Sequence, residues 1–143
     1  LFAALAAAAR SALRACAPID LANLAWAFSR FSELHGFRSP SLFAALGGAC
    51  VPRLSECSPQ HLSALASAFA ASGGEDAPKV LDAIAAHAPR RIHDFNAAEL
   101  ATLATAHAGR GRKRGTSTYR HLECLAIVRF REKHPHFGTR KGR

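Results

Sequence analysis

Leu21-Ala22-Asn23-Leu24-Ala25-Trp26-Ala27-Phe28 recurs twice in recognisable form in this chain of 143 residues. It returns as Leu62-Ser63-Ala64-Leu65-Ala66-Ser67-Ala68-Phe69 and again as Leu100-Ala101-Thr102-Leu103-Ala104-Thr105-Ala106-His107. A second landmark, Leu1-Phe2-Ala3-Ala4-Leu5, recurs in the same two registers as residues 42–46 and 80–84. An internal repeat of about 38 residues is typical of stacked helical pairs.

The composition and the spacing of apolar residues predict an all-helical fold. Hydrophobic residues make up 49% of the chain and are mostly Ala and Leu, and Ala has the highest helix propensity. Leu21, Leu24, Ala25 and Phe28 form one stripe at helical spacing. We therefore predict an all-α, short right-handed α-solenoid of about three antiparallel helical pairs. The predicted parts are a repeat array over residues 1–109, with units at about 1–40, 41–78 and 79–109, and a basic loop, C-terminal helix and tail over residues 110–143.

Capping residues, prolines and glycines mark the expected helix boundaries. The predicted starts are Pro18, Ser39-Pro40, Ser58-Pro59 and a capping box formed by Asn96 and Glu99. The predicted ends, breaks and kinks are Gly36, Gly47-Gly48, Pro52, Gly73-Gly74 and Pro89.

The positive charge of the protein belongs to its C-terminal part. Residues 1–109 hold eight Lys/Arg and eight Asp/Glu, whereas residues 110–143 hold eleven Lys/Arg against Glu123 and Glu132 and so carry the net charge of +9. Cations interspersed with glycines and aromatic residues suit RNA, which commonly orders such segments on binding. An acidic protein surface, a membrane surface or a role in solubility are the alternatives. The segment lacks a wide apolar face to insert into lipid, and no apolar run is long enough to cross a bilayer, so we predict no membrane partner.

The run from Leu21 to Phe28, preceded by Pro18 and followed by Ser39-Pro40 and the apolar residues 42–46, resembles the octotricopeptide-type repeats of organelle RNA-binding proteins. The resemblance covers residues 1–109, with Trp26 replaced by Ser67 and Thr105 in the later units. It implies an RNA-binding structural protein, a mitochondrial ribosome component that contacts rRNA phosphates beside neighbouring proteins of a ribonucleoprotein. The alternatives are an RNA maturation or translation factor that is part of a longer array, a chloroplast location, and a protein-interaction scaffold.

The candidate RNA-binding residues are cations, joined by one tyrosine. Arg53 and Arg91 share one register at the ends of first helices, where they could follow a phosphate backbone or only complement the helix dipole. Rows on the second helices, such as Trp26, Ser67 and Thr105, could read bases or only pack. The predicted RNA-binding residues are Arg53, Arg90, Arg91, Arg110, Arg112, Lys113, Arg114, Tyr119, Arg120, Arg129, Arg131, Lys133, Arg140, Lys141 and Arg143.

No residue pattern indicates catalysis, so we predict no enzyme activity, no cofactor and no metal. His121, Cys124, His134 and His136 could surround a zinc ion, but their spacing matches no familiar site. The four cysteines form no CxxC pair and are expected to be reduced and structural; they are Cys16, Cys50, Cys57 and Cys124. The chain has no Met and is helical in pattern from its first residue, so we expect a processed product or part of something longer. Its first helix would expose Leu1, Phe2 and Leu5 unless a neighbour covers it.

Overall fold

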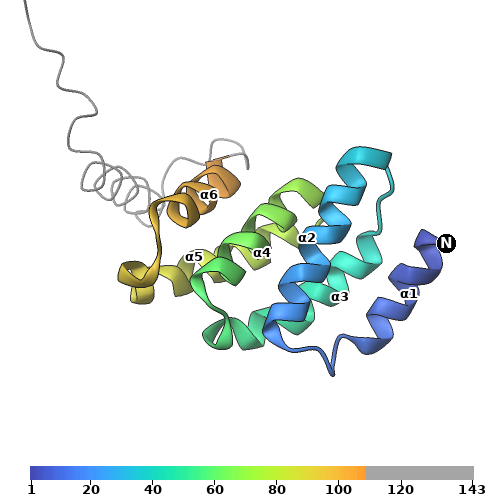
Figure 1. Ribbon diagram of the computed structural model, residues 1–143, viewed down its shortest axis with the longest axis horizontal. Helices are drawn as coiled ribbons and strands as arrows, with labels where there is room; N and C mark the ends of the chain where they lie inside the picture. Colours follow the sequence, from blue (N-terminus) through green and yellow to red (C-terminus); the bar gives the residue numbers. More distant parts are fainter. Residues whose placement is uncertain (109–143) are drawn as a thin grey trace, which may run out of the picture.

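The computed structural model describes residues 1–108, and the all-helical prediction is confirmed for this part of the chain. It contains six α-helices and two 3-10 segments, and residues 1–108 form no strand (Figure 1). In chain order the elements are α1 (Phe2–Ala12), α2 (Pro18–His35), α3 (Pro40–Cys50), η1 (Val51–Glu56), α4 (Pro59–Ser72), α5 (Ala77–His87), η2 (Ala88–Asp94) and α6 (Ala97–Ala108). The basic loop, C-terminal helix and tail predicted for residues 110–143 lie outside the described residues.

The second helix of each unit begins at the predicted cap. The Asp20 carboxylate accepts a hydrogen bond from the Ala17 backbone N–H at 3.0 Å, and Ser58 Oγ accepts one from His61 N at 3.2 Å. At the third start, Asn96 Oδ1 accepts from Glu99 N at 2.9 Å while the Glu99 carboxylate accepts from Asn96 N at 2.8 Å. This reciprocal pair is the predicted capping box, and it satisfies two backbone donors that have no partner inside the helix.

Glycines and prolines end the helices as predicted, each by a different mechanism. Gly36 and Gly73 follow α2 and α4 with φ of 69° and 62°, a left-handed conformation that glycine adopts without steric cost. Pro52 and Pro89 stand where α3 and α5 pass into the 3-10 segments η1 and η2. Proline has no N–H to donate to the preceding turn, so the regular α-helical ladder stops there.

The prediction that Gly47 and Gly48 break a helix is wrong, because both lie inside α3. A Cβ added to Gly47 would lie 2.9 Å from Val80 Cγ2 and 3.6 Å from Phe69 Cε1. Glycine therefore lets α5 and α4 come close to α3 at this point. A Cβ at Gly48 would meet nothing within 4 Å.

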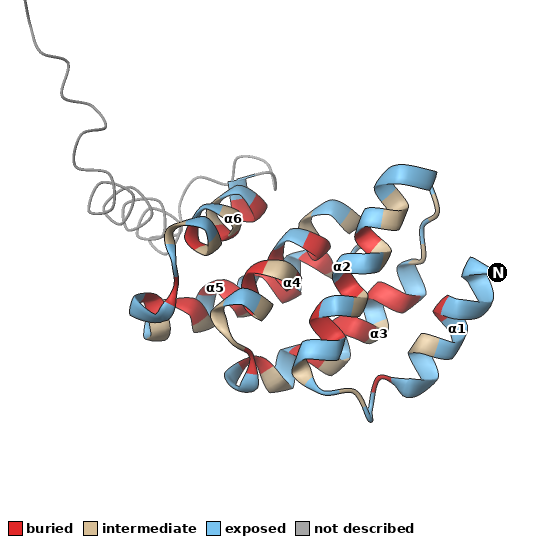
Figure 2. Ribbon diagram, viewed as in Figure 1, coloured by how far each residue is buried: buried red, intermediate tan, exposed pale blue. Residues whose placement is uncertain are grey.

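The helices pack against the helices that lie one repeat away in the sequence. α2 packs along α4 and α4 along α6, while α3 contacts both α1 and α5 (Figure 1). The buried residues gather where these helices lie next to one another (Figure 2). The Phe43 and Phe69 rings pack edge to face, with their centroids 5.4 Å apart. Leu65 and Leu81 are fully buried, and each such side chain contributes about 1.5–3 kcal/mol of hydrophobic stabilisation. The recurring Leu and Ala positions thus form the core.

The first helix exposes the apolar residues that the sequence indicated. Leu1 is 89% exposed, Leu5 48% and Phe2 39%, and most of α1 is solvent-exposed in Figure 2. The Phe2 ring is nevertheless partly covered, because its centroid lies 3.8 Å from that of Phe31 in α2. Leu1 and Leu5 therefore leave apolar surface exposed at the N-terminal end of α1.

Candidate nucleic-acid interface

Three of the predicted RNA-binding residues, Arg53, Arg90 and Arg91, belong to the part of the chain that the structure describes. All three lie in the 3-10 segments that end the first half of a unit, Arg53 in η1 and the other two in η2. The remaining predicted residues lie outside the described residues; they are Arg110, Arg112, Lys113, Arg114, Tyr119, Arg120, Arg129, Arg131, Lys133, Arg140, Lys141 and Arg143.

Arg53 links its own unit to the preceding one. Its Nη1 donates a hydrogen bond to the Cys16 backbone carbonyl at 2.7 Å, across a wide separation in the chain. The other side of the guanidinium group donates twice to the Glu56 carboxylate, from Nε at 3.3 Å and from Nη2 at 3.1 Å. The bond to Glu56 raises the pKa of Arg53 and lowers the pKa of Glu56, so both groups stay charged at neutral pH.

Arg91 repeats this geometry one unit later. Its Nη1 donates to the Cys57 carbonyl at 2.8 Å, and its Nε donates to the Asp94 carboxylate at 3.1 Å. We call this arrangement the arginine bridge: an arginine held by an acidic residue three positions later and bonded to a backbone carbonyl of the preceding unit. The shared register of Arg53 and Arg91 therefore has a structural cause.

The two bridging arginines remain partly accessible. The Arg53 side chain is 31% exposed and the Arg91 side chain 34% exposed. Contact of Arg53 and Arg91 with RNA phosphate stays a prediction. Several N–H groups of both arginines already donate to acceptors within the protein. The sequence contained a signal for the bridge, since an acidic residue follows both arginines by three positions, but the carbonyl acceptors could not be read from it.

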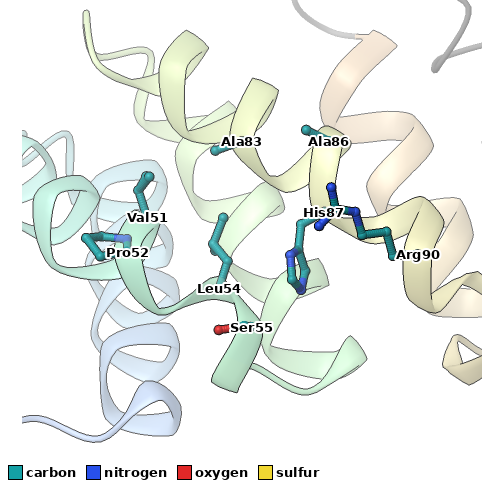
Figure 3. A pocket seen from close by; sticks show the side chains of 8 residues that line it. All are labelled: Val51, Pro52, Leu54, Ser55, Ala83, Ala86, His87 and Arg90. Carbon is teal, nitrogen blue, oxygen red and sulfur yellow. The ribbon is translucent and has the colours of Figure 1, made fainter.

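Arg90 is in a different environment from its neighbour Arg91. It is exposed and lines a hollow of about 290 Å³ between η1 and the end of α5, where His87 projects from the same stretch of chain (Figure 3). His87 Nε2 is buried and has no hydrogen-bond partner within residues 1–108. The hollow is lined by Val51, Pro52, Leu54, Ser55, Ala83, Ala86, His87 and Arg90.

The cations of residues 1–108 divide into paired and unpaired groups. Four of them form ion pairs with an acid three residues away, namely Arg30, Arg53, Lys79 and Arg91. The others form no ion pair within the described chain and are exposed; they are Arg10, Arg14, Arg38 and Arg90. Three of these four lie at or just after the end of a first helix, because Arg10 is in the last turn of α1, Arg14 follows that helix and Arg90 follows α5. An anion could reach them there.

The rows predicted on the second helices lie at the surface. Trp26 is 53% exposed, and Ser67 and Thr105 in the same register are exposed as well. The hydroxyl groups of Thr102 and Thr105 each donate to a carbonyl four residues earlier in α6. Recognition of RNA bases by these rows stays a prediction. Surface exposure is required for contact with a base, but residues that only face solvent are exposed as well.

The described cysteines are free thiols placed in or near the core. Cys50 and Cys57 are buried and Cys16 is partly buried. Burial raises the pKa of the Cys50 thiol to about 12 and also raises that of Cys57, so both stay protonated and unreactive. Between residues 1 and 108 no group of His, Cys, Asp and Glu side chains is arranged to hold a metal ion, and no helix is long and apolar enough to cross a membrane. Cys124 and the three histidines considered for zinc lie outside that range.

No family model, no curated protein and no solved structure matches the chain. Its function therefore has to be inferred from its own residues and geometry.

Proposed function

We propose that this protein is a non-enzymatic RNA-binding structural protein that contacts RNA phosphates through its basic C-terminal segment. The observation that carries the proposal is the separation of charge along the chain. Residues 1–109 are neutral, and half of their cations are ion-paired with an acid three residues away, whereas residues 110–143 hold eleven cations and two acidic residues. A long basic segment attached to a neutral helical body is suited to sequence-independent phosphate binding.

The helical body is proposed to be a short right-handed α-solenoid of about three antiparallel pairs, similar to octotricopeptide-type repeats. Packing between elements one repeat apart supports this architecture, as do the arginine bridges that join successive units at Cys16 and Cys57. Such an array presents an extended surface to a partner. Arg10, Arg14 and Arg90 add unpaired cations at the ends of first helices, where they would extend the phosphate contacts of the basic segment.

The assembly proposed for this protein is a mitochondrial ribosome, with rRNA as the nucleic acid and other ribosomal proteins as neighbours. The exposed apolar side chains Leu1, Phe2 and Leu5 favour a neighbouring protein, because burial of this surface would stabilise a complex. A chloroplast location, an RNA maturation factor and a protein-interaction scaffold are the alternatives. The maturation factor would be favoured by selective binding of one RNA sequence.

The test is RNA binding by the full chain across a salt series, with structured and single-stranded RNA. The basic-loop variant Arg112→Ala/Lys113→Ala/Arg114→Ala should bind more weakly and lower the slope of log K against log salt by about 2–3, since each lost phosphate contact lowers it by about 0.7–0.9. The matched control Arg30→Ala/Lys79→Ala removes cations that are already ion-paired and should leave the slope unchanged. Absence of RNA binding in the full chain would favour the scaffold. RNA binding that is indifferent to the loop variant would reject the basic loop as the phosphate-binding element.

A further inference from the structure

Each unit turns different residues toward its two neighbours. Ser63 Oγ in α4 lies 3.3 Å from the Glu99 carbonyl oxygen in α6, so Ser63 faces the following unit. Among the first helices, a Cβ added to Gly47 in α3 would lie 2.9 Å from Val80 Cγ2 in α5. Gly47 therefore faces the following unit, and Val80 faces the preceding one. We call these two sides of a unit its forward face and its rear face.

The rear face of the first helix is covered in the second and third units and open in the first. Val80 and Leu42 hold the same register and are buried, whereas Leu1 in that register is almost fully exposed. About one turn later, Leu5 is 48% exposed, although its counterparts in α3 and α5 are fully buried. Figure 2 shows the same contrast, since α1 is mostly exposed while buried residues run along α3.

The second helices repeat this contrast. Ala27 in α2 is exposed, whereas Ala68 in α4 and Ala106 in α6, in the same register, are buried. Leu24 is only partly buried, although its counterparts in α4 and α6 are fully buried. The cause is that α4 packs along α2 and α6 along α4, but within residues 1–108 no second helix precedes α2. Leu24 and Ala27 therefore belong to the rear face of the first unit.

Not every exposed apolar residue of the first unit belongs to its rear face. Ile19 is 48% exposed, to the same extent as Leu5, but Gln60 and Ala98 in its register are exposed as well. Trp26 likewise holds a register that is exposed in all three units. Exposure of Ile19 and Trp26 is thus a property of their position in the repeat, whereas exposure of Leu5 is particular to the first unit.

The forward faces show what covers a rear face. Their residues are small and buried; they are Ala6 in α1, Gly47 in α3, Ala22, Ala25 and Ser29 in α2, and Ser63 and Ala66 in α4. Small side chains let a neighbouring helix approach closely, and the larger Leu and Val side chains of the next rear face fill the remaining space. The partner that fits a rear face is therefore a helical pair with Ala, Ser or Gly on the side that it turns toward that face.

We infer that the rear face of the first unit is a docking surface for one more helical pair of this repeat type, with small residues on its forward face. Such a pair continues an interface that the chain already forms between its own successive units. The inference rests on the proposed function for the neighbouring protein that contributes the pair, and it does not depend on RNA. The first unit has Ala12 and Ala15 in the register of Arg53 and Glu56, so apolar contacts and no arginine bridge would hold this joint.

The test supplies such a pair by joining a copy of residues 1–41 ahead of Leu1 in the full chain. Leu1 then follows Ser41, as Leu42 does in the native chain, and the forward face of the added unit can reach Leu5. The covalent link gives the added pair a high effective concentration, so a weak contact is populated as well. Amide hydrogen exchange of the original α1 should be slower in the extended chain than in the native chain, because a covered helix opens less often.

Leu5→Gln and Ile19→Gln, made in the original first unit, are the matched variants. Both replace an apolar residue of equal exposure by a polar one, and Gln60 already holds the register of Ile19. Leu5→Gln should lower the melting temperature by on the order of 5 °C more in the extended chain than in the native chain, because a covered Leu contributes more than a half-exposed one. Ile19→Gln should have the same effect in both chains within about 1 °C.

Equal effects of Leu5→Gln in the two chains, together with unchanged exchange of α1, would overturn the inference. A native chain that dimerises in sedimentation and becomes monomeric with Leu5→Gln would overturn the assigned partner, because the occupant would then be a second copy. RNA affinity should not change with Leu5→Gln, and a loss specific to this variant would make the rear face an RNA contact instead. Absence of RNA binding in every chain would reject the proposed function but would leave the docking result standing.

Discussion

Removal of the Arg91 side chain tests whether the arginine bridge holds neighbouring units together. Arg91→Ala deletes the bond to the Cys57 carbonyl and the ion pair with Asp94 at once. Asp94→Ala is the matched control, because it deletes the ion pair and leaves the bond between units. The difference between the two variants isolates the contribution of the carbonyl bond.

The expected magnitudes follow from the exposure of the two contacts. The bond from Arg91 Nη1 to the Cys57 carbonyl is 2.8 Å long and has a charged donor, and bonds of this kind contribute about 1.5–3 kcal/mol. The ion pair with Asp94 is open to solvent, with side chains 34% and 54% exposed, so it contributes only about 0.2–0.5 kcal/mol. We expect Arg91→Ala to lower the free energy of unfolding by about 2 kcal/mol and Asp94→Ala by about 0.5 kcal/mol or less.

Urea unfolding followed by circular dichroism measures both variants. The m value should stay constant, because the surface exposed on unfolding does not change, and the midpoint should move to lower urea for Arg91→Ala. If Arg91→Ala and Asp94→Ala destabilise equally, or if both stay within about 0.5 kcal/mol of the parent chain, the bond to the carbonyl contributes nothing and the bridge has no structural role.

Three further predictions concern the core and the caps. Gly47→Ala should destabilise the protein by about 1 kcal/mol, because overpacking against Val80 exceeds the gain in helix propensity. Gly48→Ala should stabilise it by up to about 1 kcal/mol, because the added Cβ meets no other atom. Equal effects of the two variants in thermal unfolding would refute the close approach of α5 to α3. Asn96→Ala should cost about 1 kcal/mol of stability in urea, and no loss would mean that the capping box contributes nothing. The buried Cys50 thiol has a pKa raised from 9.0 to about 12, so the unfolded chain ionises first and stability should fall as pH rises above about 9, by about 1.4 kcal/mol at pH 10. Cys50→Ala should lack this part of the pH dependence, and parallel curves for the two chains between pH 8 and 10 would contradict it.

The helices and their boundaries could be predicted because their causes are local. Pro18, Gly36 and the Asn96 capping box act within one turn of their own position, so the sequence alone contains the whole mechanism. The Leu and Ala stripe predicted the core for the same reason, since its period is that of the helix.

The features that sequence reasoning missed depend on partners far along the chain. Gly47 resembles a helix breaker until Val80, in the following unit, is seen beside it. Arg53 resembles a free cation until the Cys16 carbonyl appears at hydrogen-bond distance, because a backbone acceptor has no signature in the sequence. The hollow beside His87 and Arg90 likewise arises from the approach of two units and from no motif in either.

The arginine bridge has an evolutionary consequence that follows from its acceptor. A backbone carbonyl is supplied by every amino acid, so substitution at the acceptor position leaves the bond intact as long as the local backbone conformation is kept. A unit that contains the arginine, the acidic residue and the turn after them supplies both the donor for the preceding unit and an acceptor carbonyl for the following one. Duplication of such a unit within a gene would yield two copies that fit each other at once, without a compensating mutation in the receiving copy. Arrays joined in this way can lengthen or shorten by whole units while their side chains diverge.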